Sequence, residues 1–98
     1  MNEAAGDGDR LLAALAAELA GAAGAPALAG AEPRRDDRAL VLRLARDVAH
    51  ATERQNAPLT TYIVGRYVEL RSRVGVTERD ALAEAAAVLQ RLIRSQPP

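Results

Sequence analysis

The sequence predicts an all-α protein, a small antiparallel bundle of about four helices. Ala, Leu, Arg and Glu dominate the composition and favour helix, whereas Phe and Trp are absent and only two Tyr occur. Large apolar residues recur at helical spacing in four segments, and most of the connectors between them are shorter than six residues, as between antiparallel neighbours. At 98 residues, we expect the whole chain, residues 1–98, to form one helical domain.

The first expected helix carries four leucines at helical spacing: Leu11, Leu12, Leu15 and Leu19. Asp7 or Asp9 can serve as its N-cap, and Gly21 is placed to end it. We expect residues 1–8 to be flexible, and residues 21–35 to form a mobile connector because they are rich in Gly, Ala and Pro. Acidic residues precede the apolar run, which argues against a secretory signal, and its glycines and proline argue against a membrane span. We therefore expect a cytoplasmic protein without membrane contact.

The second expected helix starts after an N-cap at Asp36 or Asp37 and ends near Arg54. One of its faces is apolar and should be buried: Leu40, Val41, Leu44, Ala45 and Val48. Small residues on this helix, Ala45 and Ala49, are expected to meet Thr61 and Gly65 of the next helix at a close crossing.

The third expected helix follows Pro58 and runs from about Leu59 to Arg73. Its apolar residues cover a wide arc, so it is interpreted as the central helix: Ile63, Val64, Tyr67, Val68, Leu70 and Val74. At least one of the two tyrosines should therefore lie in the core.

Gly75 ends that helix, and Thr77 opens the fourth one, with Asp80 three residues later in a variant of the capping box. The fourth helix has a core-facing stripe: Leu82, Ala85, Leu89, Leu92 and Ile93. A tail of residues 95–98 follows it.

Charge and composition exclude several kinds of function. Thirteen Arg balance thirteen acidic residues, so the whole molecule has no net attraction for nucleic acid or for an anionic membrane. The chain has no Cys and one His, which removes thiol chemistry and zinc sites built on Cys or on several His. No motif of a known catalytic class is present. We therefore expect no catalytic residue, no metal, no cofactor and no nucleic-acid partner.

The densest polar cluster surrounds the junction between the second and third expected helices. Asp47, His50 and Arg54 follow at spacings of three and four, so they share a helix face. The first turn of the next helix adds Thr60 and Thr61 together with unpaired backbone amides. These five residues form a candidate site for an anion or a partner.

Each of these residues also has a structural interpretation. Asp47 either orients His50 or pairs with Arg43, and His50 either binds a ligand or ties two helices together. Arg54 either contacts a ligand or binds the last carbonyls of its own helix, while the two threonines can simply serve the opening turn of the third helix.

The same region resembles a known family. The run from Leu44 to Gly65 contains D-x-A-H, an Arg four residues after the His, A-P-L-T-T followed by an aromatic residue, and a Gly four residues after the second Thr. It is similar to the signature of an uncharacterised small helical domain of actinobacteria. That domain occurs alone or fused behind a nucleotidyltransferase like the one that attaches GMP to molybdopterin.

The resemblance implies a non-catalytic accessory domain of molybdenum-cofactor (molybdopterin guanine dinucleotide) biosynthesis, with such a nucleotidyltransferase as partner. An alternative is a purely structural or homo-oligomerising helical module without a small-molecule ligand. Hydrolysis or group transfer with His50 as base is a third hypothesis, but it needs a nucleophile that the sequence does not reveal.

Overall fold

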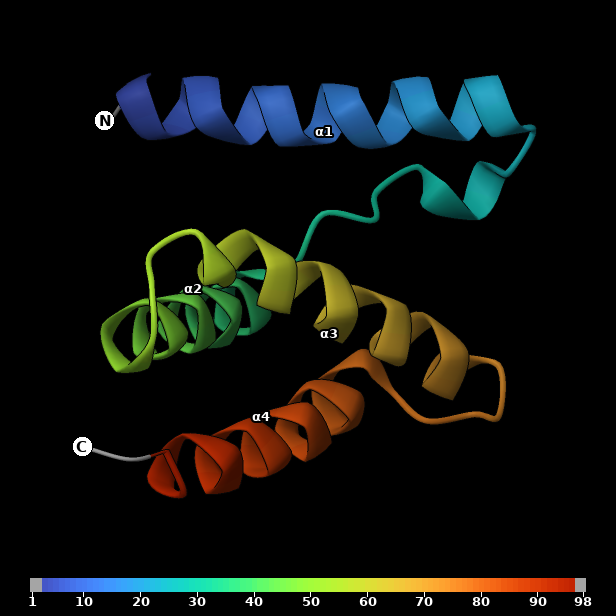
Figure 1. Ribbon diagram of the computed structural model, residues 1–98. Coiled ribbons are helices and arrows are strands. Elements are labelled where there is room, and N and C mark those ends of the chain that lie inside the picture. Colours follow the sequence, from blue (N-terminus) through green and yellow to red (C-terminus); the bar gives the residue numbers. More distant parts are fainter. Residues whose placement is uncertain (1–2, 97–98) are drawn as a thin grey trace. The chain divides into compact units, whose positions relative to one another are not determined.

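The computed structural model describes residues 3–96 and, for residues 3–7, the backbone alone. This part of the chain contains four α-helices, one 3-10 turn and no strand (Figure 1). The elements in chain order are α1 (Glu3–Ala23), η1 (Pro26–Leu28), α2 (Arg35–Ala51), α3 (Asn56–Ser72) and α4 (Glu78–Arg94). The prediction of an all-α fold with four helices is confirmed. None of the described helices is long and apolar enough to cross a lipid bilayer.

The chain divides into two units, residues 1–33 and residues 34–98. In the first unit, α1 extends beyond Gly21 to Ala23. Gly24 follows with a φ of +61°, and the amide of Ala25 donates to the Ala20 carbonyl at 2.9 Å. The expected end at Gly21 is therefore wrong, because the helix tolerates a glycine inside it. Asp9 lies within α1 instead of capping it, and so does Asp7.

The segments expected to be flexible are only partly described. Residues 1–2 and 97–98, which belong to the expected flexible start and tail, lie outside the described residues. Residues 3–8 are part of α1, and the expected connector contains the turn η1. On α1, Ala16 and Ala20 are buried, while the leucine stripe is exposed.

In the second unit, α2, α3 and α4 pack on one another, and the core is aliphatic. Its buried apolar residues are Leu44, Val48, Val64, Ala81 and Leu82. Leu44 of α2 is 1% exposed, the lowest value among the large side chains described, so it lies at the centre of this core. α3 packs on both α2 and α4, but Val64 is its only buried residue, so most of its expected apolar arc stays exposed.

Two turns position α4 relative to α3, and both were predicted. Gly75 has a φ of +88°, and the amide of Val76 donates to the carbonyl of Arg71 at 3.1 Å, which closes the end of α3. The hydroxyl of Thr77 accepts the amide of Asp80 at 3.1 Å and caps α4.

Other helix ends differ from the prediction. The N-cap of α2 is Arg34, which makes no capping hydrogen bond with its side chain, and Asp36 and Asp37 lie in the first turn. The two acidic side chains remain favourable there, near the positive end of the helix dipole. α2 also stops at Ala51, before Arg54, and α3 begins before Pro58.

The expected close crossing of small residues is also wrong. Gly65 is exposed, and a Cβ atom built on it would meet no atom within 4 Å apart from its own helix. Ala45, Ala49 and Thr61 are only half-buried. Nothing approaches the backbone closely enough to require a glycine at position 65.

Candidate functional site

The candidate site is the junction between α2 and α3, where the chain turns through residues 52–55. Thr52 ends α2: its amide and its hydroxyl both donate to the carbonyl of Val48, at 2.9 and 2.7 Å. The side-chain amide of Asn56, at the start of α3, donates to the Thr52 hydroxyl at 3.1 Å. Local hydrogen bonds therefore hold the two helix ends together.

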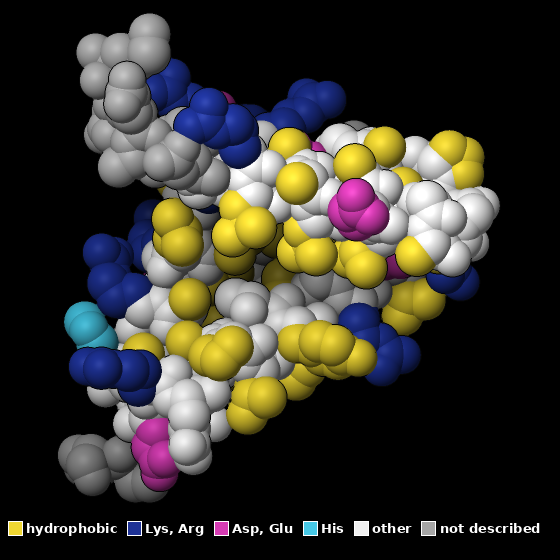
Figure 2. Space-filling model, turned by 90° about the horizontal axis from the view of Figure 1, so that it is seen from above, with side chains coloured by type: hydrophobic (Ala, Val, Ile, Leu, Met, Phe, Trp, Pro, Cys, Tyr) yellow, Lys and Arg dark blue, Asp and Glu magenta, His cyan; other side chains and the backbone are white. Residues whose placement is uncertain are grey.

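His50 and Arg54 are exposed at this junction. Within the part of the chain that the structure describes, neither side chain makes a hydrogen bond or an ion pair. Figure 2 shows the imidazole, the single cyan group, at the surface. The site therefore presents a guanidinium and an imidazole to solvent.

Asp47 does not join this pair. Its Oδ2 accepts a hydrogen bond from Nε2 of Gln90 on α4 at 2.9 Å, and its Oδ1 lies 4.0 Å from Nε of Arg46. The hypotheses that Asp47 orients His50 or pairs with Arg43 are both wrong. Asp47 fastens α2 to α4, and because Gln90 is 43 residues away, no sequence spacing indicates this contact.

The two threonines serve α3. The Thr61 hydroxyl donates to the carbonyl of Pro58 at 3.0 Å, inside its own helix. Thr60 is half-buried and lines an apolar groove between α3 and α4. Neither hydroxyl points to a common ligand with His50 and Arg54, so the five predicted residues do not converge.

The backbone amides of α3 do not form the expected anion site either. The amide of Asn56 donates to the carbonyl of Glu53 at 3.0 Å, and the amide of Ala57 donates to that of Arg54 at 3.1 Å. Pro58 has no amide hydrogen. Because the turn before α3 already uses these donors, an anion at this junction would be bound by side chains.

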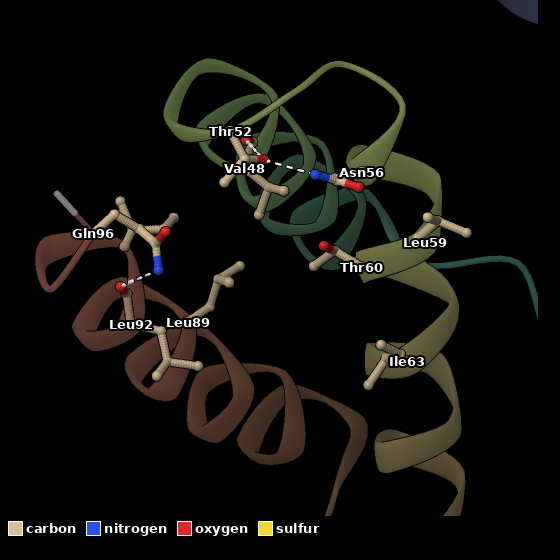
Figure 3. Close-up of a pocket in the computed structure, with 10 residues that line it drawn as sticks. Val48, Thr52, Asn56, Leu59, Thr60, Ile63, Leu89, Leu92 and Gln96 are labelled. Carbon is tan, nitrogen blue, oxygen red and sulfur yellow. Dashed lines mark hydrogen bonds between the residues drawn. The ribbon is translucent and has the colours of Figure 1, made fainter. Parts of the chain in front are cut away.

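Two adjoining grooves of about 320 Å³ each lie beside the junction. Both are lined by Thr60, Ile63, Leu89 and Leu92 (Figure 3). The polar groups that line them already have partners: the side-chain amide of Asn56 donates to the Thr52 hydroxyl, and that of Gln96 donates to the carbonyl of Leu92 at 3.5 Å. Apart from Thr60, the remaining lining is apolar.

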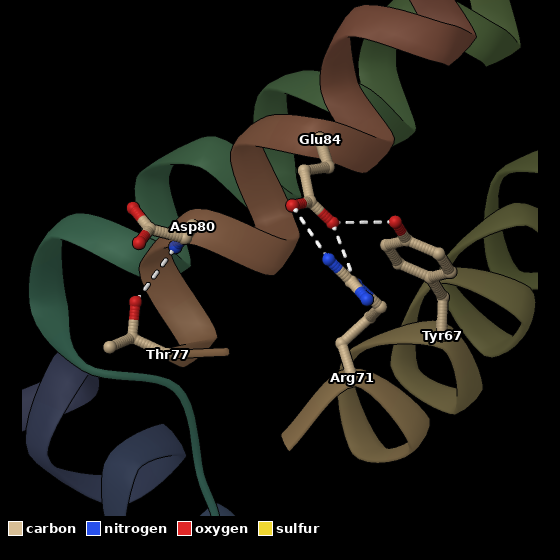
Figure 4. A network of polar contacts seen from close by, with 5 residues as sticks. All are labelled: Tyr67, Arg71, Thr77, Asp80 and Glu84. Atoms are coloured by element: carbon tan, nitrogen blue, oxygen red, sulfur yellow. Dashed lines mark hydrogen bonds and ion pairs between the residues drawn. The ribbon is translucent and has the colours of Figure 1, made fainter. Parts of the chain in front are cut away.

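A second polar network joins α3 to α4 (Figure 4). The carboxylate of Glu84 accepts the hydroxyl of Tyr67 at 2.6 Å and the guanidinium of Arg71 at 3.0 and 3.2 Å. The hydrogen bond from Arg71, followed by that from Tyr67, lowers the pKa of Glu84. Tyr67 and Arg71 are four residues apart, but only the folded chain brings Glu84 to them, so sequence reasoning missed this network.

A carboxyl pair joins the first turns of α2 and α4. Asp37 is only 4% exposed, and its carboxyl shares a hydrogen bond with that of Glu78. This bond, together with burial and the charge of Asp37, raises the pKa of Glu78. Arg79 lies 3.4 Å from Asp36 and 4.0 Å from Asp37, so a cation accompanies the buried carboxyl. Among the described residues, no group of three or more His, Asp or Glu could hold a metal ion.

A family model matches residues 3–98, and its description is "Domain of unknown function (DUF6457)". The chain belongs to the DUF6457 family. No curated protein and no solved structure matches it. Membership in DUF6457 agrees with the expectation of an uncharacterised small domain, and it assigns neither an activity nor a partner.

Proposed function

We propose that this DUF6457 chain is a cytoplasmic, non-catalytic accessory domain of molybdenum-cofactor biosynthesis. It acts beside a nucleotidyltransferase that attaches GMP to molybdopterin, and it binds an anionic group of that enzyme or of its nucleotide at the α2–α3 junction. The resemblance of Leu44 to Gly65 to the actinobacterial domain supports the pathway. The exposed and unpaired side chains of His50 and Arg54 are the observation that supports the surface.

Arg54 is the main contact in this proposal. A guanidinium presents several donors in one plane and binds carboxylates or phosphates through two parallel hydrogen bonds. Because Arg54 has no acidic partner among the described residues, an incoming anion need not displace an internal ion pair. His50 adds a second donor beside it.

The roles of the other predicted residues follow from their contacts. Asp47 supports the surface indirectly, by holding α2 against Gln90 of α4. Thr60 and Thr61 do not contribute, because one lines the apolar groove and the other is bonded inside α3. The proposed contact is therefore smaller than the five residues predicted from sequence.

A calorimetric titration tests the proposal. The full chain is titrated with the nucleotidyltransferase, alone and with GTP, and we expect Arg54→Ala to weaken binding about 10-fold or more. Arg35→Ala is the matched control, since Arg35 is an exposed arginine at the opposite end of α2. If the wild type does not bind, or if both variants bind as the wild type does, the proposal is wrong.

Thermal melts separate this function from a purely structural role of the cluster. Because His50 and Arg54 are exposed and unpaired, removing either side chain should change the free energy of unfolding by less than about 0.5 kcal/mol. A large fall in melting temperature for His50→Ala and Arg54→Ala, with binding unchanged, would support the structural alternative instead.

A further inference from the structure

α3 carries an apolar stripe next to its buried residue Val64, which lines the groove between α3 and α4. Leu59, Ile63, Tyr67 and Leu70 follow one another at spacings of three or four, so they share one helix face. All four are exposed, although large apolar side chains on a helix are normally the ones that pack.

α4 extends this stripe into a continuous surface. Val88 and Leu92 are also exposed, and together with Ile63 and Tyr67 they line the groove between the two helices. We call this surface the α3–α4 face and define it by six residues: Leu59, Ile63, Tyr67, Leu70, Val88 and Leu92. Their exposed fractions lie between 37% and 66%.

The polar groups around the α3–α4 face already have partners within the chain. Glu84 binds both the hydroxyl of Tyr67 and the guanidinium of Arg71, and Asn56 binds Thr52. Covering the face would therefore leave none of these groups buried without a partner. An unpaired buried charge is the usual cost of forming such an interface. The same pairing leaves few free donors for a small polar ligand, so an apolar protein surface fits this face better.

The size of the face agrees with that of a protein interface. With roughly 200 Å² for a fully exposed large apolar residue, the exposed fractions of the six residues correspond to roughly 600 Å². A stable interface buries about 800 Å² on each partner, including a polar rim. An area of roughly 600 Å² is at the upper end of the largest apolar patches on monomeric proteins, which are often functional.

We propose that a second copy of this chain covers the α3–α4 face, so that two copies form a dimer with twofold symmetry. Because the formal net charge is zero, two copies approach without net repulsion. Twofold pairing places each face against its own equivalent, and two helices from each copy form a four-helix arrangement. This inference does not depend on the proposed function, since His50 and Arg54 are not part of the face.

The oligomeric state of the full chain tests the proposal. Sedimentation equilibrium from low micromolar to millimolar concentration should show a monomer–dimer equilibrium. Ile63→Glu puts an unpaired charge in the face and should raise the dimer dissociation constant at least about 30-fold. Leu42→Glu is the matched control, because Leu42 is an equally exposed aliphatic residue on α2, and it should change the constant less than about 3-fold.

Circular dichroism of both variants at high dilution checks that they keep the helical content of the wild type. Because the protein has no cysteine, Ile63→Cys and Leu42→Cys each introduce a single thiol. The thiol at position 63 should react more slowly as the protein concentration rises, while the thiol at position 42 should not change. A wild type that stays monomeric overturns the proposal, and so does a dimer disrupted by Leu15→Glu on the leucine stripe of α1 but not by Ile63→Glu.

Discussion

Leu44 is the residue on which the core of residues 34–98 depends most. Replacing a buried leucine by alanine removes its packing and leaves a cavity, which costs about 2–5 kcal/mol. Leu44 is 1% exposed, so we expect Leu44→Ala to cost about 3 kcal/mol. A unit spanning residues 34–98 has a free energy of unfolding of about 3–10 kcal/mol at the usual stability per residue, so this loss removes between a third and all of it.

The assay is urea unfolding followed by circular dichroism, together with a thermal melt in which Leu44→Ala should lower the midpoint by about 12–24 °C. Leu42→Ala is the control, because it removes the same atoms from the same helix at a position that is 62% exposed. Its cost should stay below about 0.5 kcal/mol. Equal losses for the two variants would refute the assignment of Leu44 to the centre of this core.

The remaining predictions concern backbone conformation and pH. Gly65→Ala should stabilise the fold by about 0.5–1 kcal/mol, because alanine has a higher helix propensity than glycine and the new Cβ meets no atom. Gly75→Ala should destabilise the fold by about 1 kcal/mol or more, because the backbone φ at this position is +88°. Paired thermal melts check both signs. Glu78 has a raised pKa because of its hydrogen bond with Asp37. Its contribution to stability is therefore present below the pKa it has in the unfolded chain, and it is lost as pH rises through the pKa it has in the folded chain. Glu78→Gln should be more stable than the wild type at pH 7, and this advantage should disappear in acid. Glu84 has a lowered pKa, so its contribution to stability is present above the pKa it has in the unfolded chain and is lost as pH falls through the pKa it has in the folded chain. Glu84→Gln should be less stable than the wild type at pH 7, and the difference should shrink in acid. The midpoints of urea unfolding, measured over the pH range, check both variants.

The sequence predicted those features that depend on neighbouring residues. Thr77 with Asp80, and Gly75 with its positive φ, are correct because a cap and a left-handed turn need only a few adjacent positions. The end of α1 was predicted one turn early because both Gly21 and Gly24 could have ended it. Rules based on neighbouring residues do not decide which of two such glycines ends a helix.

Features that depend on distant residues could not be predicted. The apolar arc of α3 does not reveal that Val64 is buried while Ile63 stays exposed, since that depends on where α2 and α4 lie. In the candidate site, Asp47 is held by Gln90 and not by a neighbour on its own helix. Helical spacing thus placed the polar residues on one face, but it did not identify their partners.

The short links within residues 34–98 have a kinetic consequence. α2 and α3 are joined by residues 52–55, and α3 and α4 by residues 73–77, so each of these two pairs closes only a small loop when it packs. Helical proteins with such local contacts fold within microseconds to milliseconds. A ribosome needs about 50–200 ms to add one residue, so these three helices can assemble almost as soon as α4 has emerged from it.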